Sequence, residues 1–233
     1  MTVFHVILPD LDEAETARYA GLRNGADFPN ELIKAACRDA KILASAKASW
    51  QYYPYEAAVC QLHSSPPLQL QSSSIAAHLA GCSRVAVLAL TIGALLEQQA
   101  CELFAAGDYT AALLLEAAGT TAVETAADKV CALIAEQAGK EGLFTLPRFS
   151  PGYGDWDITV QPAIVSLAGG GDAGISVHES CMLLPRKSIT AVIGLKSSAT
   201  GQPSADNCKF TSCSRCSQPK CLSRKEQKND FTI

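Results

Sequence analysis

The chain of 233 residues is long enough to bury a substantial core, as one medium domain or as one domain with an appendage. With 48% hydrophobic and 18% charged residues it has the composition of a folded protein, which excludes disorder of the whole chain. The net charge of −4 argues against a general nucleic-acid binder, which needs a basic surface. The apolar stretches are too short to span a bilayer and the first residues show no secretion signal, so we expect a cytoplasmic protein.

The first part of the chain predicts one strand and two helices. Val3–Leu8 is a short apolar run that favours a strand, and the acidic sequence that begins at Asp10 offers a helix N-cap. A second helix is expected over about Asn30–Trp50, through an alanine-rich stretch. Pro54 is expected to end it.

The middle of the chain begins with a segment rich in serine and proline. Residues 62–74 predict a loop and a joint between two parts of the chain, followed by a helix that starts at Ile75. Arg84–Leu90 is a compact β-rich run, and a helix is expected over about Leu95–Phe104. No Gly-x-Gly loop follows this strand, where the sequence is Thr91-Ile-Gly, and this weakens the case for a Rossmann-like methyltransferase.

A long helix is expected from Asp108 to about Gly139. Apolar residues recur in it near helical spacing and are expected to face the core, namely Leu115, Val123, Ala127, Val130 and Ile134. Gly119 lies inside this helix, where glycine costs about 1 kcal/mol relative to alanine. It therefore indicates the close approach of another helix or of a ligand, and helix packing is the favoured interpretation.

The last third of the chain predicts mainly strands. A loop at Pro147–Asp155 is followed by two apolar runs, Ile158–Leu167 and Ile175–His178, with a glycine triplet between them. These two runs are expected to form a β-hairpin. A further strand is expected over Ile189–Leu195, and the composition of residues 196–205 predicts a linker, where we place a domain boundary.

The most specific motif is Arg148-Phe-Ser-Pro-Gly-Tyr153, which has the form Arg-x-x-Pro-Gly-Tyr. Pro151 fixes φ and Gly152 has no Cβ, so the backbone can turn sharply and pass close to a ligand. Arg148 can pair with a carboxylate through its planar guanidinium, and Tyr153 supplies a ring face and a hydroxyl. Taken alone, Pro-Gly-Tyr is also consistent with a β-turn followed by an aromatic residue at an interface.

Three ordered blocks resemble the reactivation domain of cobalamin-dependent methionine synthase, above all its short stand-alone members. The blocks are the Arg148 to Tyr153 motif, Ala117-Ala-Gly-Thr-Thr-Ala-Val-Glu124, and Glu179-Ser-Cys-Met-Leu-Leu-Pro-Arg-Lys-Ser-Ile-Thr-Ala-Val-Ile-Gly194. The resemblance covers about residues 1–197 and implies an α+β (mixed α/β) fold with helices packed around a central antiparallel or mixed sheet. It divides the chain into a helical N-terminal part (1–70), an S-adenosylmethionine-binding part (75–197), and a linker with a cysteine-rich tail (198–233).

The resemblance also implies a ligand site. It places S-adenosylmethionine on the Arg148 to Tyr153 loop, with Arg148 at the ligand carboxylate. Glu124 matches an acidic ligand contact of the long enzyme, the alternative being a solvated helix glutamate. The last block departs from the long enzyme, and there the implied contacts are with Met182, Pro185 and Ser188. The full set of implied ligand-binding residues is Glu124, Arg148, Ser150, Pro151, Gly152, Tyr153, Met182, Pro185 and Ser188. No residue is expected to be catalytic as an acid or base.

Two sites of the complete enzyme system are missing from the sequence. Its corrinoid-binding module carries Asp-x-His-x-x-Gly, whose histidine ligates cobalt, and none of the four histidines here lies in such a pattern: His5, His63, His78 and His178. We therefore expect a corrinoid-binding methionine synthase protein to supply the cobalamin. The cysteine-rich zinc site that activates homocysteine is also missing, so we expect a component of cobalamin-dependent methionine synthase and not a complete methyltransferase.

The ten cysteines fall into two groups. Six are scattered through predicted helices and strands and are interpreted as small core hydrophobes, namely Cys37, Cys60, Cys82, Cys101, Cys131 and Cys181. The other four crowd together in the tail, at Cys208, Cys213, Cys216 and Cys221. Cys-x2-Cys lets two thiolates face one metal, and zinc and an iron–sulfur cluster are comparable options. A flexible tail with free thiols is the alternative.

The tail is also basic, although the whole chain is acidic. Its positive residues are Lys209, Arg215, Lys220, Arg224, Lys225 and Lys228. They predict either a solvated tail or a patch that steers an acidic reductant, of flavodoxin or ferredoxin type, toward the corrinoid.

Two function hypotheses follow from the motif and the tail. In the first, the chain is an activator that binds S-adenosylmethionine and supports reductive methylation of inactive cob(II)alamin on a partner protein. Its own contribution is to position the methyl donor against the cobalt. In the second, it is a redox or metal-binding accessory protein of a corrinoid methyltransferase system, and the cysteine cluster carries the function.

Overall fold

The computed structural model describes residues 2–22 and 28–197. Its centre is a seven-stranded antiparallel sheet with the strand order β4-β3-β2-β5-β9-β6, and β1 pairs with β2 beside this path. A separate two-stranded sheet joins β7 and β8. The strands are β1 (Phe4–His5), β2 (Lys47–Glu56), β3 (Gln61–Leu62), β4 (Leu68–Gln69), β5 (Arg84–Thr91), β6 (Leu143–Thr145), β7 (Ser176–Val177), β8 (Leu183–Leu184) and β9 (Ser188–Ser197).

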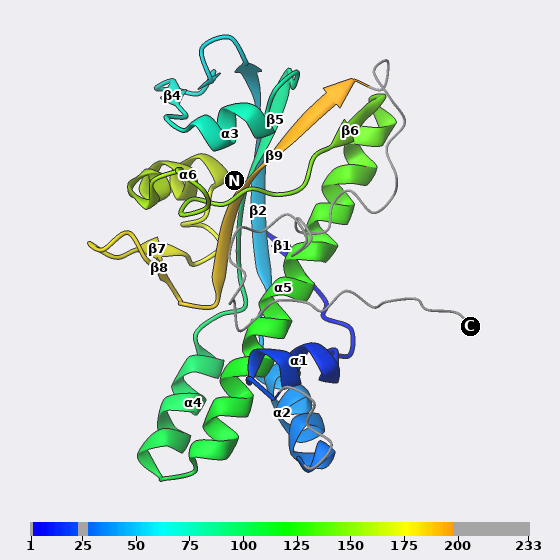
Figure 1. Ribbon diagram of the computed structural model, residues 1–233, viewed down its shortest axis with the longest axis vertical. Coiled ribbons are helices and arrows are strands. Elements are labelled where there is room, and N and C mark those ends of the chain that lie inside the picture. Colours follow the sequence, from blue (N-terminus) through cyan, green and yellow to red (C-terminus); the bar gives the residue numbers. More distant parts are fainter. Residues whose placement is uncertain (1, 23–27, 198–233) are drawn as a thin grey trace.

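Helices cover both faces of the sheet, which confirms the expected α+β class (Figure 1). The long helix α5 lies along one face, and α3 and α6 lie against the other. The helices are α1 (Glu13–Tyr19), α2 (Asn30–Leu43), α3 (Ser73–His78), α4 (Leu95–Ala105), α5 (Tyr109–Lys140) and α6 (Gln161–Ala168), with a short 3-10 helix η1 (Ile158–Val160) before α6.

The central strand β5 separates two hydrophobic cores. Successive side chains of a strand point to opposite faces, so Leu88 and Leu90 join the core under α5 while Val85 and Val87 join the core under α6. All four are fully buried. This burial on both sides explains why the sequence of β5 is almost continuously apolar.

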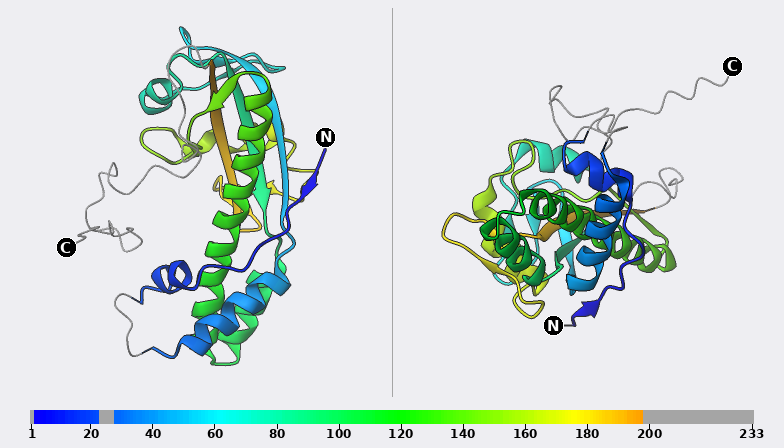
Figure 2. Two further views of the ribbon diagram at one scale, coloured as in Figure 1. Left: turned by 90° about the vertical axis from the view of Figure 1, so that its right-hand side faces the viewer. Right: turned by 90° about the horizontal axis from the view of Figure 1, so that it is seen from below.

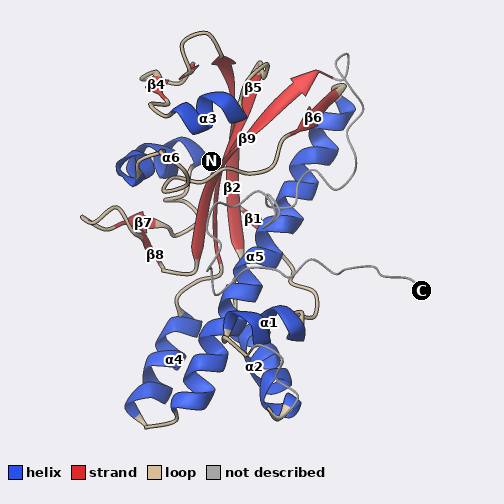
Figure 3. Cartoon of the chain, viewed as in Figure 1, coloured by secondary structure: helices blue, strands red, loops and turns tan. Residues whose placement is uncertain are grey.

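The remaining helices gather at one end of the molecule. Helices α1, α2 and α4 pack around α5 beyond the end of the sheet (Figures 2 and 3). Asp12 precedes helix α1, and its carboxylate accepts hydrogen bonds from the backbone N–H groups of Ala14 (2.8 Å) and Glu15 (3.1 Å). The expected N-cap in this acidic segment is thus confirmed, with Asp12 in that position. A buried hydrogen bond of 3.0 Å between the hydroxyls of Thr16 and Thr121 ties α1 to α5.

The strongly patterned elements lie where the sequence predicts them. The strand over Arg84–Leu90, the helices at Leu95 and Asp108, and the final strand all appear, with ends that differ by a few residues. Gly119 contacts another helix, as favoured, because a Cβ built on it would lie 2.7 and 2.9 Å from the two methyl carbons of Leu96 on α4. The glycine therefore allows α4 and α5 to pack closely.

The helix expected over Asn30–Trp50 is wrong in its second half. Helix α2 ends at Leu43, and Lys47–Glu56 forms the strand β2. Aromatic residues, which fit a half-buried pleated surface, outweigh the alanines here. Pro54 lies inside the strand and does not end a helix, and it sits opposite Arg84 in the last register pair that β2 makes with β5.

The hairpin expected from Ile158–Leu167 and Ile175–His178 is also wrong. The first run forms η1 and helix α6, and the second forms β7, which pairs with β8. A short apolar run does not distinguish a strand from a buried helix. Here a proline near the start of the run and a glycine at its end favour the helix. Pro162 lies in the first turn of α6, and Gly169 ends the helix in the left-handed conformation with φ of 73°.

The segment 62–74 joins two parts that share one sheet. It begins at the end of the short strand β3 and contains β4, and Ser72 caps helix α3, which starts two residues before the expected Ile75. Because β2 pairs with β5 over eight register positions, residues before and after this segment contribute to the same core. No helix within the described ranges is long and apolar enough to cross a membrane.

Candidate ligand-binding site

The Arg-x-x-Pro-Gly-Tyr motif forms a tight loop closed by its own backbone. The N–H of Tyr153 donates to the carbonyl of Ser150 (3.2 Å), and the N–H of Gly152 donates to the carbonyl of Trp156 (2.8 Å). Gly152 has φ of 90°, which favours glycine. Trp156 anchors the end of the loop in the core under α6. The sharp turn predicted from Pro151 and Gly152 is therefore present.

The loop starts at the sheet. Phe149 exchanges two backbone hydrogen bonds with Val192 of β9, of 2.9 and 2.8 Å. Because β9 is paired with β5 from Ser188 to Leu195, this bridge fixes the backbone on either side of Phe149. Arg148 and Ser150 are thereby held at defined places beside the sheet.

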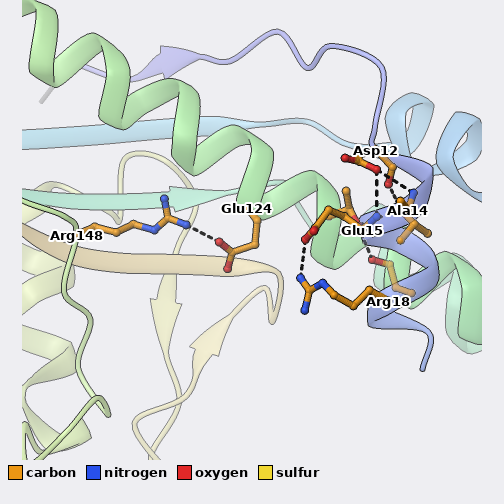
Figure 4. Close-up of polar contacts among 9 residues, drawn as sticks. Asp12, Ala14, Glu15, Arg18, Glu124 and Arg148 are labelled. Carbon is orange, nitrogen blue, oxygen red and sulfur yellow. Dashed lines mark hydrogen bonds and ion pairs between the residues drawn. The ribbon is translucent and has the colours of Figure 1, made fainter. Parts of the chain in front are cut away.

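Arg148 is a buried cation with two carboxylate partners. It is only 4% exposed, and its guanidinium reaches toward α5 (Figure 4). Nη2 pairs with Glu124 and Nη1 pairs with Asp128 at 2.5 Å. Burial acts to lower the pKa of Arg148, but the neighbouring charges, first that of Glu124, raise this pKa above its ordinary value. The guanidinium is thus charged at any physiological pH, and it holds both carboxylates in place.

The two carboxylates differ in their surroundings. They lie four residues apart on one face of α5, and their side chains are 35% (Glu124) and 51% (Asp128) exposed. Glu124 borders the cavity described next, whereas Asp128 does not. Of the alternatives for Glu124, the structure therefore shows a buried partner and a position at a cavity, not a fully solvated side chain.

A cavity of about 200 Å³ lies beside the loop. Seven of the nine residues predicted to bind the ligand line it, namely Glu124, Arg148, Ser150, Pro151, Tyr153, Met182 and Ser188. Gly152 and Pro185 do not line it. The wall is completed by seven further residues that were not predicted to bind the ligand, namely Ile158, Gln161, Cys181, Leu183, Arg186, Ile189 and Thr190. The cavity thus brings together segments from α5, the motif loop, the start of α6 and the β8–β9 region.

Polar groups in the wall are held by defined partners. The hydroxyl of Thr190 donates to Gln161 over 2.9 Å, and both side chains are buried. Burial, followed by the charge of Glu124, raises the pKa of Tyr153, while Arg148 acts to lower it. The Tyr153 hydroxyl therefore stays neutral near pH 7 and can serve as a donor or an acceptor.

A network of ion pairs fastens the β8–β9 turn to the helices. Arg186 pairs with Glu116 of α5 at 2.8 Å, and Lys187 pairs with the same carboxylate at 2.9 Å. The backbone N–H of Lys187 donates to Glu97 of α4 over 2.7 Å. The wall formed by Met182 and its neighbours is thus connected to the helical end of the molecule.

A second, larger cavity of about 460 Å³ lies between α2, α4 and α5. Its wall is mainly apolar, with Leu32, Leu103 and Leu114 among the contributors. It contains none of the residues predicted from the motif or the resemblance. The smaller cavity, in contrast, has charged and polar groups converging on it, as ligand sites commonly do.

The cysteine predictions have different outcomes. Cys37, Cys82 and Cys131 are buried as expected, whereas Cys60 and Cys181 are partly exposed and Cys101 is exposed. The core interpretation is wrong for Cys101, because it lies on the outward face of α4. No group of three or more His, Cys, Asp or Glu residues within 2–22 and 28–197 is arranged to hold a metal ion. The predicted metal ligands Cys208, Cys213, Cys216 and Cys221 lie outside the described residues.

Comparison with known proteins identifies the fold. No family model and no curated protein matches the sequence. Among solved structures, the chain is similar to the MetH reactivation domain bound to AdoHcy, with a TM-score of 0.58 and 12% identity. The match covers 88% of this chain and 81% of that chain. The chain therefore has the fold of the MetH reactivation domain, in agreement with the resemblance noted in its sequence.

Proposed function

We propose that this chain binds S-adenosylmethionine in the cavity beside the motif loop and acts as the activation component of a cobalamin-dependent methionine synthase. The observation that carries the proposal is that seven residues picked from sequence blocks far apart in the chain line one cavity. The fold supports it, because the similar solved domain belongs to MetH and holds AdoHcy. S-adenosylmethionine differs from that ligand by the methyl group on its sulfur.

The pair formed by Arg148 and Glu124 suits the amino-acid end of this ligand. That end carries a carboxylate and an ammonium group, and the cavity presents a guanidinium and a carboxylate that pair with each other. On binding, the ligand carboxylate replaces Glu124 at Arg148, and Glu124 turns to the ligand ammonium. The net charge is unchanged, and no buried charge is left unpaired. Asp128 keeps its contact with Nη1 and holds the guanidinium in position.

Reactivation requires a methyl group and one electron. A reductant of flavodoxin or ferredoxin type would supply the electron to the cobalamin on the partner, and S-adenosylmethionine held by this chain would supply the methyl group. The transfer would form one cobalt–carbon bond, break one sulfur–carbon bond and leave the sulfur as a neutral thioether. No side chain of this chain needs to transfer a proton, so its contribution is to hold the methyl donor in line with the cobalt.

The partner is a corrinoid-binding methionine synthase protein. Apolar side chains are exposed around the cavity, where Tyr153 and Met182 line it and Leu184 follows in β8. An apolar rim of this kind suits the docking of a large, flat corrinoid on its protein. The alternative, a redox or metal-binding accessory protein, depends on the cysteines of the tail. Metal analysis of the purified chain distinguishes the two, because bound metal would favour the alternative.

Calorimetry with S-adenosylmethionine and the isolated chain tests the site. We expect Arg148→Ala to weaken binding by about 1.5–3 kcal/mol, the worth of a charge-assisted hydrogen bond. Arg84→Ala is the matched control, because Arg84 also pairs with a carboxylate, that of Glu141, but does not line the cavity. If the intact chain shows no binding, the site is misassigned.

The activation step is tested in trans. A cob(II)alamin-loaded methionine synthase without its own reactivation domain, a reductant and S-adenosylmethionine should form methylcobalamin faster when this chain is added. The absorbance change of the corrinoid reports the rate. If binding is measured but methylcobalamin forms no faster, the chain is a ligand-binding protein without the activation role.

A further inference from the structure

Helix α3 holds the motif loop at both of its ends. The carboxylate of Asp155 accepts four hydrogen bonds, from the hydroxyls of Ser72 (2.6 Å) and Ser73 (2.7 Å) and from the backbone N–H groups of Ser73 (2.8 Å) and Ser74 (2.9 Å). At the other end of the helix, the His78 ring nitrogen Nε2 lies 2.8 Å from the carbonyl oxygen of Pro147. The two ends of α3 therefore contact the two ends of the segment Pro147–Asp155, which carries the motif.

The contact between loop and helix is close. A Cβ built on Gly154 would lie 2.6 Å from the hydroxyl oxygen of Ser74, and Gly154 has φ of 58°. A glycine is needed there for both reasons. Hydrogen bonding by Ser72, Ser73 and Ser74 also holds the pKa of Asp155 well below its ordinary value, first through the hydroxyl of Ser72. The carboxylate thus remains charged, and the contact persists, across the physiological range of pH.

The tip of the loop is exposed, and its contacts within the loop include the backbone hydrogen bonds of the turn and the edge contact of the Tyr153 ring with that of Phe149, whose centroids are 6.1 Å apart. Pro151 and Trp156 are buried at its base, but Gly152, Tyr153, Gly154 and Asp155 are all exposed. Exposed loops with few packed side chains open at low free-energy cost. The Asp155 carboxylate joins this exposed tip to α3 by hydrogen bonds and so helps to fix Tyr153 in the cavity wall.

We propose that Asp155 is a positioning residue that fastens the loop to α3 and so forms the cavity wall before any ligand arrives. The proposal rests on the proposed function, because it concerns the same cavity. Ordering a loop when a ligand binds costs free energy, and a wall that is already ordered avoids this cost. The affinity for the ligand is therefore higher. Asp155 itself does not line the cavity and needs no contact with the ligand.

The test compares variants of the intact chain by two readouts. Hydrogen exchange of the peptide that spans residues 148–157, measured without ligand, reports the order of the loop, and calorimetry reports affinity for S-adenosylmethionine. In Asp155→Ala, we expect exchange of this peptide to accelerate and the dissociation constant to rise about tenfold, while the melting temperature stays nearly constant. Asp155→Asn keeps one acceptor oxygen, so its loop exchange and its dissociation constant should lie between those of the unmodified chain and those of Asp155→Ala.

Asp157→Ala is the matched control. Asp157 is also an exposed carboxylate in this segment, but it accepts the backbone N–H of Thr159 (2.8 Å) and makes no bond to α3. It should change neither readout. Ser73→Ala, combined with Asp155→Ala in a double-mutant cycle, should show effects that are less than additive, because both changes remove the same contact.

The outcomes separate this proposal from the proposed function. If loop exchange in Asp155→Ala matches that of the unmodified chain, the positioning role is wrong, whatever the affinities are. If exchange accelerates but the unmodified chain does not bind S-adenosylmethionine, the positioning role stands and the proposed function fails. If Asp155→Ala melts at a much lower temperature, Asp155→Asn and Ser73→Ala decide the matter by the same two readouts.

Discussion

Gly152 occupies a backbone conformation that other residues rarely adopt. Its φ is 90°, although a Cβ built on it would meet nothing within 4 Å. Gly152→Val therefore acts through backbone strain and not through a clash, and a β-branched residue is strained most. We expect it to distort the loop and to abolish the acceleration of methylcobalamin formation, with little loss of melting temperature because the site is exposed.

Gly171→Val is the matched control for this prediction. Gly171 is likewise exposed with nothing within 4 Å of a built Cβ, but its φ lies outside the left-handed region. It should form methylcobalamin at the unmodified rate. Equal rates for the two variants would contradict the role assigned to the turn at Gly152.

His78 makes the stability of the fold dependent on pH. Burial lowers its pKa below the ordinary value of 6.5, although its bond to Pro147 acts to raise it. The unfolded chain then binds a proton more readily than the folded chain, so this contribution is complete above pH 6.5 and is lost as the pH falls through the lowered pKa. Urea unfolding between about pH 7 and pH 5 should show a steeper loss than in His78→Gln, which keeps a donor and cannot titrate. Parallel curves for the two proteins would contradict this assignment.

Without the resemblance, which added Glu124, Met182 and Ser188, only the loop motif of the site could be predicted from the sequence. Arg148, Ser150, Pro151 and Tyr153 follow from one motif, because the chemistry of a turn is local. Gln161 was missed, since its hydrogen bond to Thr190 joins residues far apart in the chain. The pairing of Arg148 with Glu124 and Asp128 was missed for the same reason, because it depends on how α5 lies beside the loop.

The contact between helices α4 and α5 leaves no room for a larger side chain at Gly119. A side chain at Gly119 would displace Leu96, and the carbon Cε of Lys187 also lies 3.3 Å from the built Cβ. We expect Gly119→Val to lower the free energy of unfolding by about 1–3 kcal/mol, the usual effect of overpacking. Gly139→Val is the control in the same helix, because nothing lies within 4 Å of its built Cβ. Urea titrations measure both, and a stabilising Gly119→Val would contradict the packing described.

Elements were predictable where the sequence pattern was long. Helix α5 repeats its apolar positions over many turns, and β5 is a continuous apolar run, so their types follow from the sequence. Helix α6 has only eight residues, and its apolar run fits a strand equally well. β2 was mistaken for a helix because alanines precede it and its partner, β5, lies beyond the segment 62–74.

At the scale of the whole molecule, the described residues form two hydrophobic cores, whose buried members lie between Leu8 and Leu195. The composition of residues 196–205 is that of a linker. We therefore predict that deleting residues 206–233 leaves the melting temperature almost unchanged. A large loss would show that the cysteine tail contributes to the fold, and metal analysis of the full chain would then test whether a bound ion is responsible.

The position of β9 governs the order in which the molecule can fold. It is the last described strand, and it pairs with β5 from Arg84↔Leu195 to Thr91↔Ser188, so the partners are roughly a hundred residues apart. Until β9 has been synthesised, one edge of β5 stays open and neither core can close. Contacts this distant slow folding, because a long loop must be closed before they form. Chains that end before Ser188 should consequently aggregate through the open edge of β5 and not yield a smaller folded unit.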